Sequence, residues 1–145
     1  MTGSRIRRVV QEDETDCGIA CVAMVTGRSY RYVAGLIRRR VLRKANGVVY
    51  TRHRDIQRAL RLLGFRSLKL WFRTWRTMRA PAIVPTGRTV DRRYWHWVVL
   101  RGDGRARRLL DPTPGSRRMV HDFRGYRARG YYIVVNPRRG ARALP

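Results

Sequence analysis

One stretch near the N-terminus is apolar on every side, and it constrains the fold more than any other feature. Residues 18–25 are one glycine followed by seven apolar residues. A helix that is apolar all round has no face to show to water, so it must lie inside the protein. Thr15 or Asp16 can cap its start, and Gly27 is suited to end it. We therefore expect a central buried helix between Asp16 and Gly27.

The spacing of apolar residues changes near residue 64. Before it, two segments carry apolar residues at helical intervals. The first is followed by Arg38–Arg40, which indicates a surface helix, and the second ends at Gly64, a suitable helix-stopping residue. The apolar positions of these two predicted helices are Tyr32, Val33, Leu36 and Ile37, and then Ile56, Ala59, Leu60 and Leu63.

Beyond residue 64 the chain is divided into short segments rich in β-branched and aromatic residues, separated by Gly, Pro and Asp. They are FRSLKLWF (65–72), APAIVPT (80–86), YWHWVVLR (94–101), RRLLD (107–111) and GYYIVVN (130–136). Helices followed by antiparallel strands make an α+β fold. A chain of 145 residues has the size of one domain. We expect a single domain over residues 1–145, with short basic tails at about 1–7 and 137–145.

The chain is extremely basic, with 34 Lys and Arg against 9 Asp and Glu and a formal net charge of +25. The arginines are dispersed from Arg5 to Arg142. Two interpretations remain open: a bias in base composition, or a polyanionic partner such as nucleic acid, an acidic protein or an anionic membrane surface. Nonspecific affinity for nucleic acid is one expectation. The four tryptophans lie in apolar or strand-like stretches and form no evident base-stacking platform, which slightly disfavours a dedicated nucleic-acid function.

No segment approaches the ~20 apolar residues of a membrane span, and the start of the chain lacks the features of a signal peptide. Cys17 and Cys21 lie four residues apart, a poor spacing for a disulfide within a helix. They have no second pair of ligands for a metal. We expect a cytoplasmic protein with no metal and no cofactor, and leave its oligomeric state open.

Cys17 stands where the buried helix begins, so it is either a core thiol or a nucleophile. A nucleophilic cysteine needs a base and a group that orients the base. The three histidines are His53, His96 and His121. His53 lies among arginines, and His121 lies in a predicted loop. Only His96 lies on a predicted strand with a carboxylate suitably placed.

A hairpin brings that carboxylate to His96. The strand that contains His96 runs into a turn at Gly102–Gly104, and the returning strand ends at Asp111. Pairing of the two strands places Asp111 near His96, where it can fix the imidazole tautomer. Taken alone, a histidine between two tryptophans is often a core or interface residue, and DPTPG is an ordinary turn.

Several motifs together resemble a known family. Four residues separate Gln11 from DCG, and AC and Met24 follow. Then come APAIVP, HWVVL, LLDPTPG and HDFRGY. In this order they resemble the bacteriocin-processing, or double-glycine, cysteine peptidases. These papain-like domains are best known from the N-termini of peptidase-containing ABC transporters. The resemblance covers roughly residues 8–135.

The resemblance implies Cys17 as nucleophile, His96 as general base and acid, and Asp111 as the residue that orients His96. It implies Gln11 as a donor to the oxyanion. Physical chemistry supports these assignments: a helix N-terminus and a neighbouring imidazolium favour a thiolate. A glutamine amide can donate to the oxygen of a tetrahedral intermediate. Cys21, one turn further on, is expected to be a core thiol.

We therefore predict a stand-alone, papain-like cysteine peptidase that cleaves a leader or precursor peptide after a Gly-Gly-like site. The chain has neither the membrane spans nor the GxxxxGK motif of the transporter-borne members. The leading alternative is a weakly active or inactive domain of this fold that serves as a basic binding module or toxin, on nucleic acid or an acidic protein. Amide or isopeptide hydrolysis at the same residues is a third possibility. Seven arginines are expected to rim the cleft, and they suit an acidic leader: Arg73, Arg76, Arg79, Arg92, Arg93, Arg117 and Arg118.

Overall fold

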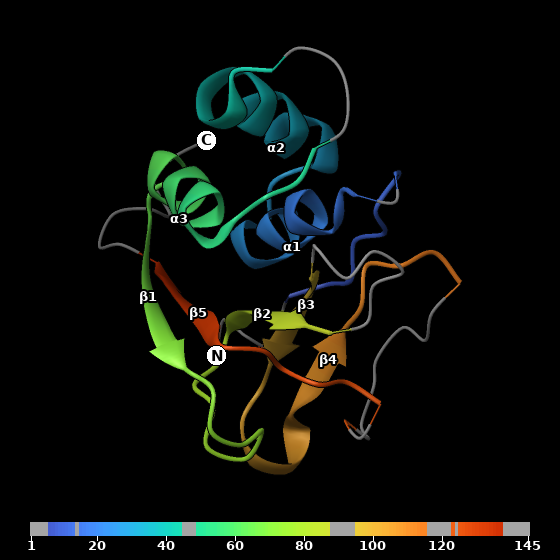
Figure 1. The fold of residues 1–145 in the computed structure, drawn as a ribbon, viewed down its shortest axis with the longest axis vertical. Coiled ribbons are helices and arrows are strands. Elements are labelled where there is room, and N and C mark those ends of the chain that lie inside the picture. Colours follow the sequence, from blue (N-terminus) through green and yellow to red (C-terminus); the bar gives the residue numbers. More distant parts are fainter. Residues whose placement is uncertain are drawn as a thin grey trace.

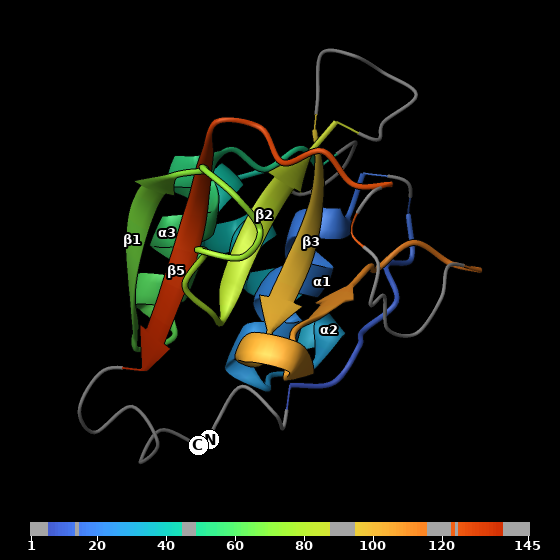
Figure 2. The ribbon, with the colours of Figure 1, turned by 90° about the horizontal axis from the view of Figure 1, so that it is seen from below.

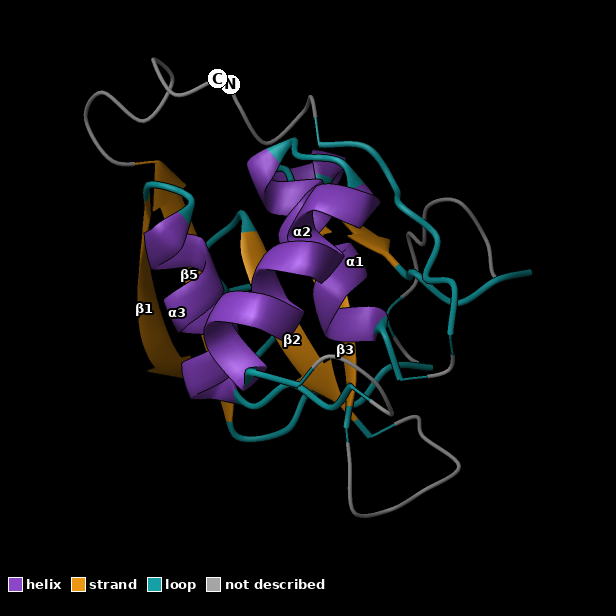
Figure 3. Cartoon of the chain, turned by 90° about the horizontal axis from the view of Figure 1, so that it is seen from above, coloured by secondary structure: helices purple, strands orange, loops and turns teal. Residues whose placement is uncertain are grey.

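Helices cover one face of an antiparallel sheet in the computed structural model (Figures 1 and 3). The structure describes residues 6–13, 15–44, 49–87, 95–115, 123 and 125–137. The helical layer consists of α1 (Cys17–Thr26), α2 (Tyr30–Leu36), which continues as a π-helix, η2 (Ile37–Leu42), and α3 (His53–Leu62). All three predicted helices are present.

The sheet has the strand order β1-β5-β2-β3-β4. Its strands are β1 (Phe65–Trp71), β2 (Ala82–Thr86), β3 (His96–Arg101), β4 (Arg108–Leu110) and β5 (Tyr131–Pro137), and neighbouring strands pair antiparallel. Each of the five predicted segments contains one strand. The predicted α+β fold class is confirmed, and the strand β5 lies between β1 and β2 although it comes last in the chain.

The central helix α1 is buried from its first residue to Val25, as its composition predicts. It packs against β3, β2 and the two neighbouring helices (Figure 3). Gly27 ends it in a left-handed conformation with φ of 73°, and its N–H donates to the carbonyl of Ala23. Asp16 occupies the N-cap position, but its side chain makes no capping hydrogen bond and instead accepts one from the Tyr30 hydroxyl at 2.5 Å. The prediction of side-chain capping by Asp16 is wrong because its backbone, with φ of −90° and ψ of 13°, lacks the extended conformation of a capping residue.

The sheet buries apolar residues on both of its faces. On the helical side, α1 and α3 pack against Ile83, Trp97 and Ile133. On the opposite side, Met78, Tyr126 and Tyr132 belong to a second cluster. Figure 2 views the sheet from this second side, with the helices behind it. The second cluster contains no helix residue, so the segments that flank the strands provide its cover.

The described ranges contain no helix long and apolar enough to cross a membrane. Of the predicted basic tails, only residues 6, 7 and 137 fall within these ranges, and the rest of both tails lies outside the described residues.

Candidate active site

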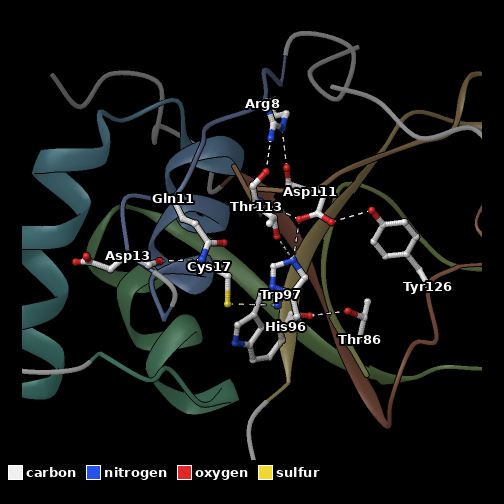
Figure 4. Close-up of polar contacts among 10 residues, drawn as sticks. All are labelled: Arg8, Gln11, Asp13, Cys17, Thr86, His96, Trp97, Asp111, Thr113 and Tyr126. Atoms are coloured by element: carbon white, nitrogen blue, oxygen red, sulfur yellow. Dashed lines mark hydrogen bonds and ion pairs between the residues drawn. The ribbon is translucent and has the colours of Figure 1, made fainter. Parts of the chain in front are cut away.

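Cys17 is the first residue of α1, and its side chain is almost enclosed, with 7% of the residue exposed. The sulfur accepts a hydrogen bond from the backbone N–H of Trp97 on β3, at 3.5 Å (Figure 4). The first N–H groups of a helix have no partner within it, and they give this end a partial positive charge. The fold therefore places the thiol at the end of α1 that carries the partial positive charge.

The glycine that follows the cysteine is required by packing. A Cβ atom added to Gly18 would lie 1.9 Å from Oγ1 of Thr51 and 3.0 Å from its Cβ. Thr51 is buried, and its carbonyl accepts a hydrogen bond from the Trp97 indole at 3.1 Å. Thr51 and Trp97 therefore form a wall against which the start of α1 can pack only if residue 18 has no side chain.

His96 begins β3, opposite Thr86 in the register of the sheet. The buried Thr86 hydroxyl donates to the His96 carbonyl at 2.9 Å and so fixes its backbone. On the ring, Nε2 lies 2.7 Å from Oδ1 of Asp111 and 3.1 Å from the hydroxyl of Thr113. The tautomer that places a proton on Nε2 leaves Nδ1 for the Cys17 thiol, with which the imidazole also interacts.

The surroundings of His96 stabilise its charged form. Burial disfavours an imidazolium and lowers its pKa, but the hydrogen bonds with Asp111 and Cys17 outweigh burial and raise the pKa of His96 to about 9. For Asp111, burial and the contacts with His96 shift the pKa in the opposite directions. Burial raises the pKa of a carboxyl group, yet the hydrogen bond and charge of His96 hold the pKa of Asp111 well below its usual range. The two side chains therefore form a buried ion pair.

Asp111 immediately follows β4, and it makes further contacts besides His96. The backbone N–H of Thr113 donates to Oδ1 at 2.9 Å. The hydroxyl of Tyr126 donates to Oδ2 at 2.7 Å (Figure 4). The predicted hairpin is present: Arg101 pairs with Arg108 across the turn, and the returning strand carries Asp111 back to His96.

Gln11 comes from the segment before α1, and only 5% of it is exposed. Its backbone N–H donates to the carbonyl of Pro112 at 2.9 Å, and its side-chain amide donates to the carbonyl of Asp13 at 2.8 Å. Figure 4 shows the amide beside Cys17. The segment that carries Gln11 is thus tied to the loop that follows Asp111.

Arg8 strengthens the same connection. Its Nε donates to the carbonyl of Asp111, and a terminal guanidinium nitrogen donates to the carbonyl of Thr113, both at 2.6 Å. Figure 4 shows these two contacts of Arg8. Together with the Gln11 N–H, residues 8–11 thus donate to the three consecutive carbonyls of residues 111–113 after β4.

The other candidate residues lie apart from these contacts. Cys21 is fully buried one turn along α1, and burial raises its pKa well above the usual value, which fits the predicted core thiol. His53 is the first residue of α3, and its Nε2 donates to the Tyr131 carbonyl at 2.8 Å. His121 lies outside the described residues. Within the described ranges, no cluster of three His, Cys, Asp or Glu side chains could hold a metal ion.

Three of the predicted rim arginines lie within the described residues. Arg73, Arg76 and Arg79 are exposed in the segment that leads into β2. That segment is held by Arg107, which donates to the carbonyls of Trp75 and Met78. It enters β2 at Ala82, which pairs with Leu100, toward the end of β3 opposite to His96. Arg73 follows β1, whose last residue, Trp71, pairs with Tyr131. The position of these three arginines at the rim of the cleft stays a prediction. The other four rim arginines lie outside the described residues.

Sequence reasoning missed Arg8, Thr113 and Tyr126. Thr113 belongs to the DPTPG turn and Tyr126 to HDFRGY, both of which contribute to the family resemblance. Neither motif indicates where a hydroxyl points. Arg8 is one of many dispersed arginines and carries no local signal.

Comparison with known proteins identifies the family. The sequence matches the profile of the Peptidase C39 family over residues 5–139, which is nearly the whole chain. The chain belongs to the peptidase C39 family. No curated protein sequence matches this C39 domain. The predicted relationship to bacteriocin-processing peptidases is confirmed.

Three solved structures of peptidase domains or proteases are similar to the C39 domain. One is the peptidase domain of Streptococcus ComA, a bi-functional transporter involved in quorum sensing (TM-score 0.68, 22% identity, covering 92% of this chain and 100% of that one). Another is a double glycine motif protease from an AMS/PCAT transporter in complex with the leader peptide (TM-score 0.63, 20% identity, covering 92% and 96%). A third is the peptidase domain of Streptococcus mutans ComA (TM-score 0.59, 22% identity, covering 90% and 99%). At these identities the likeness shows the shared fold.

Proposed function

We propose that this C39 domain is an active cysteine peptidase that cleaves a leader or precursor peptide after a Gly-Gly-like site. The observation that carries the proposal is the continuous set of contacts from Asp111 through His96 to Cys17 at the N-terminus of α1. A thiol, a base and a group that orients the base are the three parts that nucleophilic catalysis requires. Membership of the C39 family supports the same reaction.

In the proposed reaction, the proton of the Cys17 thiol is held on Nδ1 of His96 before the substrate reacts, and the thiolate attacks the scissile carbonyl carbon. A C–S bond forms as the carbonyl π electrons move to oxygen. The imidazolium then gives its proton to the leaving amine as the C–N bond breaks. Water attacks the thioester, His96 takes a proton from it, and the thiol is regenerated as the acid product leaves. Asp111 remains ionised throughout and holds the imidazole in place.

Gln11 is proposed to stabilise the oxyanion together with the backbone N–H of Cys17. The side-chain amide donates to the Asp13 carbonyl, which orients the group, and we assign to this amide the role of a donor to the oxyanion. Gln11→Ala is expected to lower kcat about 100- to 1,000-fold with little change in melting temperature. If Gln11 only braces its loop, this variant will lose stability more than activity.

The proposed substrate class rests on the family and on one neighbouring structure. That neighbour is a double glycine motif protease in complex with the leader peptide. A Gly-Gly site suits a nucleophile as enclosed as Cys17, because only small residues beside the scissile bond can bring the carbonyl within reach. The net charge of +25 favours capture of an acidic leader, with an encounter rate that falls as salt is added.

The test is cleavage of internally quenched peptides that carry a Gly-Gly site after an acidic leader, with mass spectrometry of the products. Wild type is expected to cut directly after the second glycine, and Cys17→Ala is expected to be inactive. A matched peptide with Val-Val at the site controls for specificity, and a neutral leader controls for charge. If the wild type, shown to be folded, cleaves no Gly-Gly peptide under conditions where Cys17 is alkylated, the proposed reaction is wrong.

A further inference from the structure

The carboxylate of Asp111 is held on the side that faces away from His96. Its oxygen Oδ1 accepts from the His96 ring and from the Thr113 backbone. Its oxygen Oδ2 accepts from the hydroxyl of Tyr126 at 2.7 Å. Asp111 and Tyr126 are 5% and 8% exposed, so water competes little for this contact. The two oxygens therefore have different partners, and Tyr126 holds the one that the catalytic histidine does not use.

The ring of Tyr126 is itself anchored. It belongs to the apolar cluster on the sheet face opposite to the helices, together with Met78 and Leu109. Its backbone N–H donates to the carbonyl of Phe123 at 2.9 Å, which closes a turn just before the hydroxyl-bearing side chain. A phenol fixed in this way can constrain the carboxylate, because neither partner can move without disturbing the core.

A carboxylate with one bonded oxygen can rotate about its Cβ–Cγ bond and exchange its two oxygens. A donor on Oδ2 opposes this rotation and also compensates a buried charge, which is costly when left unpaired. We propose that Tyr126 is a positioning residue that keeps Oδ1 of Asp111 directed at His96. The inference rests on the proposed function and adds Tyr126 to the residues that align the imidazole of His96.

The first test is Tyr126→Phe, which removes the hydroxyl and keeps the ring. We expect kcat to fall about tenfold with KM unchanged, because a hydrogen bond to a charged group is lost at a residue that orients the base. Tyr132→Phe is the matched control. Tyr132 is buried in the same cluster, and its hydroxyl accepts from the Arg79 N–H at 3.3 Å, away from Asp111. It should change kcat less than about twofold.

A double-mutant cycle separates positioning from general support of the fold. In an Asp111→Asn background, Tyr126→Phe should have almost no further effect on kcat, because the group through which it acts has already been changed. A tenfold loss in both backgrounds would overturn the proposal. Equal activity of Tyr126→Phe and wild type would overturn it too. Melting temperatures of all variants, measured in parallel, identify any loss that comes from unfolding.

A second measurement of the role of Tyr126 needs no peptide substrate. The rate at which iodoacetamide alkylates Cys17 is measured against pH in wild type and in Tyr126→Phe. Without the hydroxyl on Oδ2 the carboxylate is less well directed at His96, so it supports the imidazolium less, and the imidazolium in turn supports the thiolate less. The low-pH limb of the profile should therefore move to higher pH. Within the described ranges, the titratable and charged groups near Asp111 include His96, Tyr126, Cys21 and Arg8.

The two readouts distinguish failure of this inference from failure of the proposed function. If wild type cleaves no peptide but the alkylation profile shifts in Tyr126→Phe and stays fixed in Tyr132→Phe, the positioning role holds without the peptidase assignment. If peptides are cleaved and neither kcat nor the profile of Tyr126→Phe changes, the positioning role is wrong and the peptidase assignment stands.

Discussion

Two histidines in the described part of the chain are neighbours of Trp97, and their pKa values are shifted in opposite directions. His96 precedes Trp97 in the chain, and His53 packs against its ring. His96 contacts Asp111 and Cys17, and these hydrogen bonds raise its pKa to about 9 although burial opposes them. The ring of His53 packs edge-on against two tryptophans, with its centroid 5.2 Å from that of Trp95 and 5.0 Å from that of Trp97. Its polar partner is the backbone carbonyl of Tyr131. Burial lowers the pKa of His53.

The difference teaches that burial alone does not make a catalytic histidine. His96 is buried and His53 is half-buried, and burial favours the neutral form of each ring. Of the two, only the His96 ring contacts both a carboxylate, which stabilises its charged form, and a thiol, with which it can exchange a proton. The following predictions test this contrast between the region around His96 and the region around His53.

The largest expected effect comes from matched substitutions of the two histidines. His96→Gln should lower kcat/KM by at least about 10⁴-fold, because the general base and acid are lost. His53→Gln keeps a donor for the Tyr131 carbonyl and should change kcat/KM less than about threefold. Steady-state kinetics on the Gly-Gly peptide measure both. A large loss of kcat/KM in a folded His53→Gln enzyme would contradict the contrast.

The pH profile provides a second test of His96. A base whose folded pKa lies at about 9 keeps its proton through neutral pH and loses it as the pH rises through that value. Activity that needs the imidazolium should therefore fall with an apparent pKa near 9 in the alkaline limb of kcat/KM. Asp111→Asn removes the partner that raises the pKa, so this limb should move to lower pH. A limb that stays in place would show that another group titrates there.

The two cysteines of α1 extend the comparison to the nucleophile. Cys17 lies at the end of the helix, and Cys21 lies one turn inside, where burial raises its pKa. At pH 7, iodoacetamide should label Cys17 at least about 100-fold faster than Cys21, as measured by mass mapping over time. Slow and equal labelling of both thiols would mean that the N-terminus of α1 does not activate Cys17.

A smaller effect is expected at Arg8, which holds the backbone that carries Asp111. Arg8→Ala removes the donors to the carbonyls of Asp111 and Thr113 and should lower kcat about three- to tenfold. Arg7→Ala makes the same change of charge at an exposed neighbour, so it controls for electrostatic effects on substrate binding. If both variants lose activity equally and the loss disappears at high salt, Arg8 acts through charge rather than position.

The smallest effect concerns Asp16, which precedes the nucleophile. Burial raises the pKa of Asp16, so its ionisation in the folded state is disfavoured. A raised folded pKa gives stability that is present below the unfolded value and is lost as the pH rises through the folded one. The melting temperature of Asp16→Asn relative to wild type should therefore increase by about 2–4 °C between pH 4 and pH 7. Calorimetry at the two pH values checks it, and a difference that does not depend on pH would contradict it.

Much of the fold could be predicted from the sequence because the local patterns are strong. The segment from Cys17 to Val25 has no polar face, so it had to be a buried helix, and the five β-rich segments became the five strands. The hairpin between His96 and Asp111 followed from the length of its strands and turn. One less local feature was missed: the side chain of Asp16 accepts a hydrogen bond from Tyr30 and does not cap α1.

The sequence by itself therefore determined the order of the elements, the family and the identity of the candidate residues Gln11, Cys17, His96 and Asp111. These depend on spacing along the chain and on side-chain chemistry, both of which can be read locally. Tertiary structure alone decided which groups surround Asp111. Tyr126 reaches its carboxylate and Arg8 reaches its carbonyl from segments 15 and 103 residues away. Contacts of this kind depend on how the segments pack in three dimensions, and no local pattern encodes where a side chain from a distant segment will point.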